Sequence, residues 1–567
     1  MGAYKVESVL GPLFKLLEAT FELIVPLVVA SIIDVGIEQQ NKPHIWKMCL
    51  ILVALALIGL ICSITAQFFA AKASVGFATK LRHILFAHVQ SLSNTDIDRL
   101  GSSTLITRMT SDINQVQSGV NLALRLLLRS PFVVFGAMVM AFTVDVRSAL
   151  VFAVIIPILC VVVFGIMLIS IPLYRRVQAS LDRVLGITRE NLVGVRVLRA
   201  FGKQADETEE FDRRNEHLTA VQKHVGKITA LMNPVTFLLI NLAIIALIYT
   251  GALQVRDGVL TQGEVVALYS YMSQILVELI KMASLIISMT KAAACGSRIQ
   301  KILEVEPSQH FSDTPVTPDR NADAIAFSHV GLTYEGAGES SLHDISFTAA
   351  RGETIGVIGG TGSGKSSLIS LIPRFYDATE GEIRIAGIPV NHYPAEQLRS
   401  VIGIVPQKAV LFHGTVRDNM RWGRTDATDE EIRRALELSQ AAEFIDQLED
   451  GLDHMIEQGG RNLSGGQRQR LTIARALVAN PEILILDDSA SALDYATDLK
   501  LRRAIAGMDP APTTVIVSQR AASIRHADRI LVLDDGELVA QGTHDELLNR
   551  CEVYQEIYYS QFPKEEA

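Results

Sequence analysis

Three long stretches without a charged residue stand out in the first half of this 567-residue chain. They are Met48–Ala66, Ser148–Tyr174 and Ile228–Val255, of 19, 27 and 28 residues. A helix rises about 1.5 Å per residue, so each stretch can cross a hydrocarbon layer of about 30 Å. Mean hydropathy is also positive, at +0.28, which is high for a soluble protein. The chain is therefore expected to be anchored in a membrane.

Three further apolar segments are interrupted by charged residues, and counting them gives six membrane-spanning helices. They are Leu13–Ile33 with Lys15, Glu18 and Glu22, Gly119–Val144 with Arg125 and Arg129, and Val265–Thr290 with Glu278 and Lys281. Ionisable groups inside a span are costly, and they often line a transport pathway.

The polar residues within the spans are candidates for a substrate cavity. The candidates are Glu18, Glu22, Arg125, Asn233, Asn241 and Glu278, together with Arg129 and Lys281. Alternatives stay open for four of them. Arg125 and Arg129 could lie near a membrane face and extend toward water, and Glu278 could form a structural pair with Lys281 three residues later.

The connections between the spans alternate in length and charge. Residues 72–118 and 175–227 are long and basic, whereas 37–47, 145–147 and 256–264 are short and carry few basic residues. Excess Lys and Arg marks the cytoplasmic side, which places both chain ends there. The long connections have apolar residues at helical spacing, and a hairpin with arms of about 26 residues would extend about 39 Å from the membrane.

The composition changes after residue 305. Residues 306–322 contain three prolines and no periodic apolar face, which indicates a linker between a membrane domain, 1–305, and a second domain, 323–567. In the second domain, short β-branched runs alternate with helical patterns, as in a soluble α/β fold. The net charge of -9 gives no sign of a nucleic-acid partner, and five scattered cysteines indicate neither disulfides nor a zinc site.

Gly359–Ser366 has the pattern G-x-x-x-x-G-K-S after an apolar strand and at the start of a helix, which predicts a P-loop for ATP and Mg²⁺. Lys365 would reach the terminal phosphates, while Ser366 and Asp487 would hold the metal ion. The backbone of the loop and the start of the helix would surround the phosphates. The residues expected to bind the phosphates are Gly359, Gly360, Thr361, Gly362, Ser363, Gly364, Lys365, Ser366 and Ser367.

The segment NLSGGQRQRLTIARAL, Asn462–Leu477, lies between the P-loop and Asp487. With these motifs in this order, the whole chain resembles the ATP-binding cassette (ABC) transporters, and in particular a type I exporter half-transporter. The resemblance implies a fold of six transmembrane helices that extend into the cytoplasm, followed by an α/β P-loop nucleotide-binding domain. Coupling segments are expected near 103–112 and 190–203, although both could be ordinary solvated helical loops.

The resemblance also assigns roles to further residues. Tyr334 would stack on adenine, unless it is a core tyrosine, and Gln407 would contact Mg²⁺. A signature motif would close on the ATP held by the opposite subunit, and a D-loop would communicate across the dimer. The signature is Leu463, Ser464, Gly465, Gly466 and Gln467, and the D-loop is Ser491, Ala492, Leu493 and Asp494.

Two positions depart from the pattern of an efficient ATPase. Asp488 stands where the family usually has a Glu that positions the attacking water, and its side chain is shorter by about 1.5 Å. A misplacement of about 1 Å can cost about 10²-fold in rate. Gln519 replaces the usual His, and its amide carries neither a proton nor a positive charge. Gln458 is a smaller departure, in place of a Glu often found before the signature.

Asp488 and Gln519 both weaken the site built on this chain's own P-loop, whereas the intact signature serves the other site. The sequence therefore predicts a heterodimer with a homologous half-transporter that supplies the usual Glu and His. Such a pair would use ATP to export amphiphilic or drug-like molecules by alternating access, from an inner membrane with a cytoplasmic nucleotide-binding domain. The alternatives are a siderophore-like importer with the exporter fold and a non-transporting ATP sensor.

Overall fold

The computed structural model describes residues 2–489 and 492–562 of the chain. These residues form two compact units. The first contains Met1–Gln90 and Ser103–Val305, and the second contains Ser91–Ser102 and Glu306–Ala567. The first unit is helical throughout, and the second combines helices with β-sheets.

Among the described residues of the first unit, six helical segments are long and apolar enough to cross a membrane, which confirms the predicted number of spans. They are Lys5–Ile37, Lys42–Ser91, Ser102–Val144, Val146–Val193, Gln204–Arg256 and Gln262–Leu303. The helices are α1 (Lys5–Ser31), α2 (Lys42–Ser91), α4 (Ser102–Thr107), α5 (Ile113–Leu126), α6 (Arg129–Val144), α7 (Val146–Val193), α8 (Val195–Ala200), α9 (Gln204–Ala230), α10 (Met232–Arg256) and α11 (Gln262–Leu303), with π-helical turns at Ile32–Ile37 and Arg108–Asp112.

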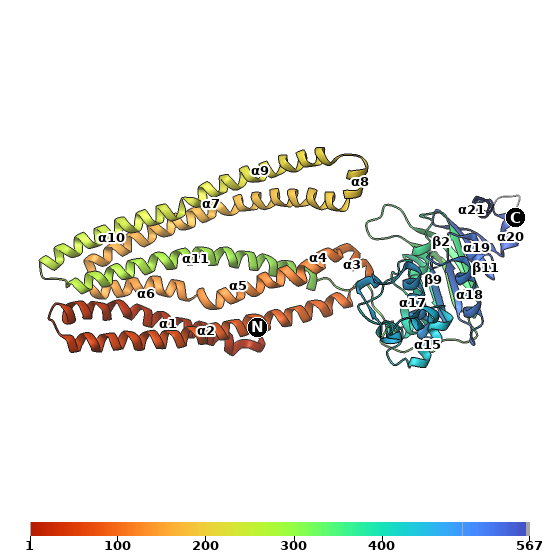
Figure 1. Cartoon of the computed structure of the whole chain (residues 1–567), viewed down its shortest axis with the longest axis horizontal. Helices are drawn as coiled ribbons and strands as arrows, with labels where there is room; N and C mark the ends of the chain where they lie inside the picture. The colour runs from red at the N-terminus through yellow and green to blue at the C-terminus, as the bar shows by residue number, and fades with distance from the viewer. Residues whose placement is uncertain (1, 490–491, 563–567) are drawn as a thin grey trace. The chain divides into compact units, whose positions relative to one another are not determined.

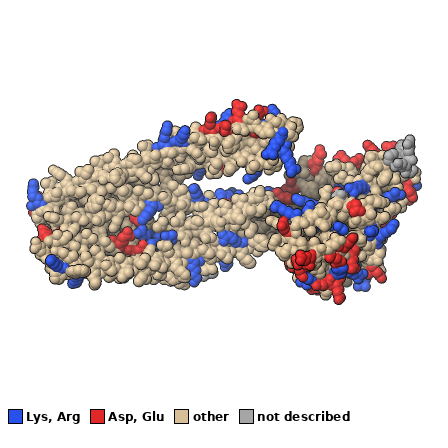
Figure 2. All heavy atoms as spheres, viewed as in Figure 1, with Lys and Arg blue, Asp and Glu red and all other residues tan. Residues whose placement is uncertain are grey.

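Several of these helices are much longer than a membrane is thick. Helix α2 has 50 residues and α7 has 48, so each extends over about 70 Å. Figure 1 shows the long helices of this unit running alongside one another. Much of the unit's surface in Figure 2 is free of charged atoms, as expected for helices that face lipid. The predicted helical extensions beyond the membrane are therefore present.

Small side chains let the membrane helices approach closely. Ala19 of α1, Ala137 of α6 and Ala267 of α11 are fully buried in one apolar cluster. Such residues favour close helix packing in a membrane. The buried Tyr271 hydroxyl donates a 2.7 Å hydrogen bond to the Leu23 carbonyl and so joins α11 to α1.

The turn between α7 and α9 carries an exposed apolar tip, formed by Leu192, Val193, Val197 and Phe201. The exposed fractions of Val193 and Phe201 are 84% and 76%, and no residue of α8 is buried. Large apolar patches are uncommon on monomeric soluble surfaces and usually mark contact sites. The segment predicted near 190–203 forms this turn.

The described residues of the second unit form three sheets. A four-stranded antiparallel sheet has the order β2-β1-β4-β5, a six-stranded sheet has the order β12-β11-β3-β10-β9-β6, and β7 pairs with β8. In the six-stranded sheet all neighbouring pairs are parallel except β11 with β12. The strands are β1 (Ile325–Leu332), β2 (Leu342–Ala349), β3 (Thr354–Gly359), β4 (Glu380–Ile385), β5 (Ile388–Pro389), β6 (Ile402–Val405), β7 (Gly414–Thr415), β8 (Met455–Ile456), β9 (Ile483–Asp487), β10 (Thr513–Val517), β11 (Arg529–Asp534) and β12 (Glu537–Gly542).

The central strands β3, β9 and β10 are apolar along almost their whole length because both faces of the sheet are buried. All three end at the same edge of the sheet, since they are parallel. This edge is where α/β folds usually bind ligands. The helices of the unit are α3 (Asn94–Leu100), α12 (Lys365–Leu371), α13 (Ala395–Ser400), α14 (Val416–Arg421), α15 (Asp429–Leu438), α16 (Ala442–Asp446), α17 (Gly465–Val478), α18 (Tyr495–Ala506), α19 (Ala521–Ile524), α20 (His544–Arg550) and α21 (Glu552–Gln561).

Helix α3 belongs to the second unit although it lies early in the sequence. Its buried Asp96 accepts hydrogen bonds from the backbone and side chain of both Ser93 and Ser308. Asp98 accepts a 2.7 Å hydrogen bond from the Tyr376 hydroxyl. The coupling segment expected near 103–112 lies outside this helix. Its residues form most of α4 and the following π-helical turn, and they belong to the first unit.

Candidate functional site

The P-loop connects the end of β3 to the start of α12. Gly362 and Gly364 have φ values of 89° and 90°, which side-chain-bearing residues rarely adopt. A Cβ atom at Gly364 would also lie 2.8 Å from the Ser341 carbonyl oxygen. Both positions therefore need glycine for the loop to curl around the N-terminus of α12.

Lys365, the first residue of α12, folds back into this loop. Its ammonium group donates to the carbonyls of Gly359 and Gly360 at 3.0 and 2.5 Å and to the Ser363 hydroxyl at 3.2 Å. Burial lowers the pKa of Lys365, because a buried ammonium loses its hydration. A negatively charged ligand in the loop would offset that cost.

A cavity of about 520 Å³ lies beside the P-loop at the carboxyl edge of the central strands. It brings together residues that are up to about 200 positions apart in the sequence. Its lining includes Thr361, Gly362, Ser363, Gly364, Lys365, Ser366, Ser367, Gln407, Asp487, Asp488 and Gln519. Most of the predicted nucleotide-binding and metal-binding residues thus share one polar cavity.

The two acids at the end of β9 differ in environment. Burial, with a smaller contribution from the neighbouring Asp488, raises the pKa of Asp487. Asp488 has a left-handed backbone, with φ of 44°, and its amide donates to the Val517 carbonyl at 2.9 Å. The side-chain amide of Gln407 lies 3.5 Å from the Asp488 carboxylate. Gln407, Asp487 and Asp488, three of the residues predicted to hold the metal ion and the attacking water, are therefore neighbours.

The residues of this cavity fit ATP with Mg²⁺. Two charges that burial disfavours, the Lys365 ammonium and the Asp487 carboxylate, line the same cavity. A phosphate beside Lys365 and a divalent cation beside Asp487 would compensate both. Ser366, Gln407 and Asp487 would supply oxygen ligands, the type that Mg²⁺ prefers. The bound nucleotide would contribute the phosphoanhydride bond whose hydrolysis drives the protein.

Tyr334 lies next to the P-loop helix and outside the cavity lining. Its hydroxyl donates a 3.0 Å hydrogen bond to Ser367, and its ring meets that of Tyr376 edge-on at 5.1 Å. The ring is half-buried. An adenine-stacking role for Tyr334 thus remains a proposal.

The signature motif lies elsewhere in the second unit. Ser464 caps α17, and its backbone N–H donates to the Gln467 side chain at 2.8 Å. None of the predicted signature residues lines the cavity at the P-loop. Gly465 is exposed, with open space where a side chain would project. The D-loop lies beside the signature in space, since the Ala492 carbonyl oxygen is 3.2 Å from a Cβ placed on Gly466. Its first residue, Ser491, is outside the described residues.

The first unit contains a network of charges between three membrane helices. Arg129 of α6 donates to Glu22 of α1 and to Glu278 of α11, each at 2.6 Å. Glu278 also accepts from Ser130 at 2.9 Å and pairs with Lys281 at 2.9 Å. The side-chain exposures are 8% for Arg129, 4% for Glu278 and 43% for Glu22.

A cavity of about 230 Å³ adjoins this network, and its lining includes Glu22, Gln274, Glu278 and Lys281. The side-chain oxygen Oε1 of Gln274 is buried and has no hydrogen-bond partner among the described residues. The other predicted cavity residues do not line it. Glu18 pairs with Lys15, Asn241 donates to its own helix backbone, and Arg125 and Asn233 also lie outside the lining.

Sequence reasoning missed several residues at these sites. Asp535 and Gly536 form the turn between β11 and β12, and they line the P-loop cavity. The dipeptide Asp-Gly does predict a hairpin turn, but its place beside the phosphate loop depends on strand order. Gln274 was also missed, because a neutral side chain in an apolar run gives little signal.

Comparisons with known proteins agree with this arrangement. The family described as "ABC transporter transmembrane region" matches residues 8–279, and the family "ABC transporter" matches residues 342–491. The uncharacterized ABC transporter ATP-binding protein YfiB of Bacillus subtilis (strain 168) is 38% identical over 562 residues, which cover 99% of this chain and 97% of that protein.

Two similar proteins have more specific names. The probable multidrug resistance ABC transporter ATP-binding/permease protein YheI of Bacillus subtilis (strain 168) is 34% identical, over 85% of this chain and 82% of its own. The ATP-dependent lipid A-core flippase of Vibrio vulnificus (strain CMCP6) is 29% identical, over 94% of this chain and 91% of its own.

A solved structure shares the fold. It is a bacterial Atm1-family ABC exporter with ATP bound, with a TM-score of 0.80, 22% identity and coverage of 99% of both chains. The predicted fold class and the multi-pass membrane location with a cytoplasmic nucleotide-binding domain are confirmed. The chain belongs to the ABC transporter family and has the exporter-type fold, with an ATP-binding domain that implies ATPase-coupled transport.

Proposed function

We propose that this chain is one subunit of a heterodimeric ABC exporter and that its two nucleotide motifs serve different sites. Its P-loop site binds ATP and hydrolyses it slowly, because Asp488 and Gln519 stand at the two catalytic positions. Its signature, Leu463–Gln467, completes the faster site on a homologous partner that has the usual Glu and His. The observation that carries the proposal is that both substituted residues line the P-loop cavity, whereas the signature does not.

The proposed chemistry depends on reach and on protonation. The Asp488 carboxylate is about 1.5 Å too short to position a water molecule as a Glu would. The Gln519 amide can donate a hydrogen bond to a phosphate, but it cannot stabilise developing negative charge with a positive one. The intact signature supports a working site elsewhere, since only a partner's ATP would use it.

The cavity between α1, α6 and α11 supports an amphiphilic substrate. It places two carboxylates, a lysine and the unpaired Gln274 carbonyl beside the apolar side chains of Val133 and Val277. A polar head group could hydrogen-bond there while an apolar body contacts the valines. We propose Glu22 and Gln274 as substrate contacts. The Glu22 side chain keeps 43% of its surface exposed although it pairs with Arg129, and the Gln274 side-chain oxygen has no partner among the described residues, whereas Arg129 and Glu278 are almost fully buried.

Restoring the catalytic positions tests the division of labour. The purified chain in lipid nanodiscs is expected to hydrolyse ATP at about the rate of its Lys365→Ala variant. The double variant Asp488→Glu/Gln519→His should be about 100-fold faster, because two identical copies can then complete each other's sites. The measurement is steady-state phosphate release.

Adding Gly465→Asp to that double variant provides the control. A carboxylate at this open position repels ATP held by the other copy without a steric clash, so the gain should disappear. The proposal is wrong if the unmodified chain alone hydrolyses ATP as fast as the double variant.

A further inference from the structure

Helix α19 begins two residues after Gln519, and side chains from two other helices hold its two ends. It has only four residues, Ala521–Ile524, and the side chain of its N-cap residue Arg520 does not cap the helix. A helix this short leaves most of its terminal N–H and C=O groups without internal partners. The position of the Gln519 loop therefore depends on what supplies those partners.

Gln561, the last residue of α21, supplies them at the start of α19. Its side-chain nitrogen donates to the Gln519 carbonyl at 2.8 Å, and its side-chain oxygen accepts from the Ala521 N–H at 2.9 Å. The amide of Gln561 thus makes one hydrogen bond to the residue before Arg520 and one to the residue after it. A two-point contact of this kind fixes both the position and the orientation of the loop.

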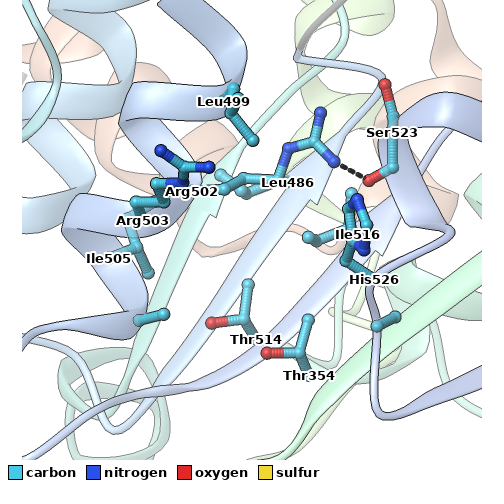
Figure 3. Close-up of a pocket in the computed structure, with 12 residues that line it drawn as sticks. Thr354, Leu486, Leu499, Arg502, Arg503, Ile505, Thr514, Ile516, Ser523 and His526 are labelled. Carbon is cyan, nitrogen blue, oxygen red and sulfur yellow. Dashed lines mark hydrogen bonds between the residues drawn. The ribbon is translucent and has the colours of Figure 1, made fainter.

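Arg502 of α18 supplies a partner at the other end of α19. Its guanidinium donates to the Ser523 carbonyl, as Figure 3 shows, and its Nε donates to Asp498 at 3.1 Å. Both Arg502 and Ser523 line a cavity of about 330 Å³ above the central strands. Because the D-loop residue Asp494 caps the start of α18, this contact also links the D-loop to α19.

The element that carries Gln561 is anchored independently of that residue. Tyr554 and Tyr558 of α21 are 0% and 5% exposed, and both pack into the larger apolar core of the second unit. The Tyr558 ring also stacks on Phe562 at 4.9 Å. Removing the Gln561 amide should therefore leave α21 in place.

We propose that Gln561 is a positioning residue for Gln519, so that the C-terminal helix sets how long ATP stays on this chain's own P-loop. By holding the loop backbone, it keeps the Gln519 side chain in the lining of the nucleotide cavity. The motifs that identify the family do not include Gln561. The inference rests on the proposed ATP site at Gly359–Ser366.

The test measures ATP release from the full-length chain in nanodiscs, with a fluorescent ATP analogue and Mg²⁺ in stopped flow. Gln561→Ala should release the analogue about fivefold faster, since it removes two hydrogen bonds that hold the loop. Gln561→Glu keeps the acceptor and loses the donor, and should give an intermediate rate. Gln555→Ala is the matched control on the same helix, because the Gln555 amide donates to the Leu548 carbonyl and not to the loop around Gln519.

A double-variant cycle separates positioning from a general structural role. In a Gln519→Ala background, Gln561→Ala should change the release rate by less than about 1.5-fold, because the side chain that it positions is gone. An unchanged rate for Gln561→Ala alone, or an equal effect in both backgrounds, would overturn the inference. If Lys365→Ala bound the analogue as well as the unmodified chain, the proposed ATP site itself would be wrong, and the inference with it.

Discussion

Asp488 has a side chain that suits its backbone conformation but is shorter than the Glu expected at this position. Its φ of 44° lies in the left-handed region, which Asp tolerates better than most residues because its short side chain can hydrogen-bond locally. The longer side chain of Glu is less able to make such a local hydrogen bond, so Glu tolerates the left-handed region less well. Asp at this position therefore relieves backbone strain at the end of β9 while it shortens the group that would position water.

The charge network in the membrane gives a prediction about single residues. Arg129→Met would leave Glu278 buried with one of its cationic partners missing, and should destabilise the protein by about 3–5 kcal/mol. Arg129→Met/Glu278→Met should recover much of that loss, since a buried pair can be replaced by apolar groups at little cost. The measurement is unfolding of the detergent-solubilised protein by heat or denaturant.

A second ion pair provides the comparison for this prediction. Lys203 and Asp206 also pair at 2.7 Å, but their side chains are 62% and 65% exposed. Lys203→Ala should leave the unfolding midpoint unchanged. Equal effects of Lys203→Ala and Arg129→Met would show that the buried network does not stabilise the helix contacts.

At the scale of elements, α3 depends on a few polar contacts with the nucleotide-binding domain. Burial and the neighbouring Asp98 raise the pKa of the Tyr376 phenol, so it stays protonated and donates its hydrogen bond at neutral pH. Tyr376→Phe should make amide hydrogen exchange in α3 about fivefold faster, as one hydrogen bond is lost. Mass spectrometry of the peptide around 94–100 measures this directly.

An exposed tyrosine of the same unit serves as the control for this exchange experiment. Tyr495 begins α18 with an exposed fraction of 63%, so Tyr495→Phe should leave exchange in α3 unchanged. If Tyr376→Phe had no effect either, Asp96 and its serine partners would be sufficient to hold α3. The contact with Tyr376 would then not stabilise this helix.

The elements show where sequence reasoning works and where it stops. Charge-free runs and β-branched runs report the solvent around each segment, so the sequence predicted six spans and an α/β domain after them. The helical segments nevertheless extend up to about 25 residues beyond the predicted apolar runs. The P-loop was also predictable, because its chemistry needs a fixed local spacing. Helix α3 was not, since its place depends on contacts with Ser308 and Tyr376, more than 200 residues away.

The candidate cavity in the membrane shows the same limit. Charges within apolar runs identified Glu22 and Glu278, but periodicity could not show that Arg129 occupies the space between them. Asn241 looked equally suitable, yet its amide donates to the Phe237 carbonyl one turn earlier. Which polar groups meet depends on helix rotation, and three-dimensional packing alone sets that rotation.

For the whole molecule, the direction of transport is the decisive measurement. Inside-out vesicles that contain this chain and the proposed homologous partner should take up rhodamine 6G, an amphiphilic fluorescent cation, when ATP is added. Gly465→Asp in this chain should stop uptake by disabling the partner's site, while Asn241→Ala should not. ATP-driven release instead of uptake would indicate an importer, and no flux despite ATP binding would indicate a sensor.

The exposed apolar tip at Leu192–Phe201 bears on how cells handle this protein before assembly. Val193 and Phe201 have most of their surface exposed to water in the isolated chain. Chaperones and proteases recognise such surfaces on incomplete proteins. Unassembled copies should therefore be removed faster than assembled ones, and the abundance of this chain in the membrane should follow the supply of the proposed partner.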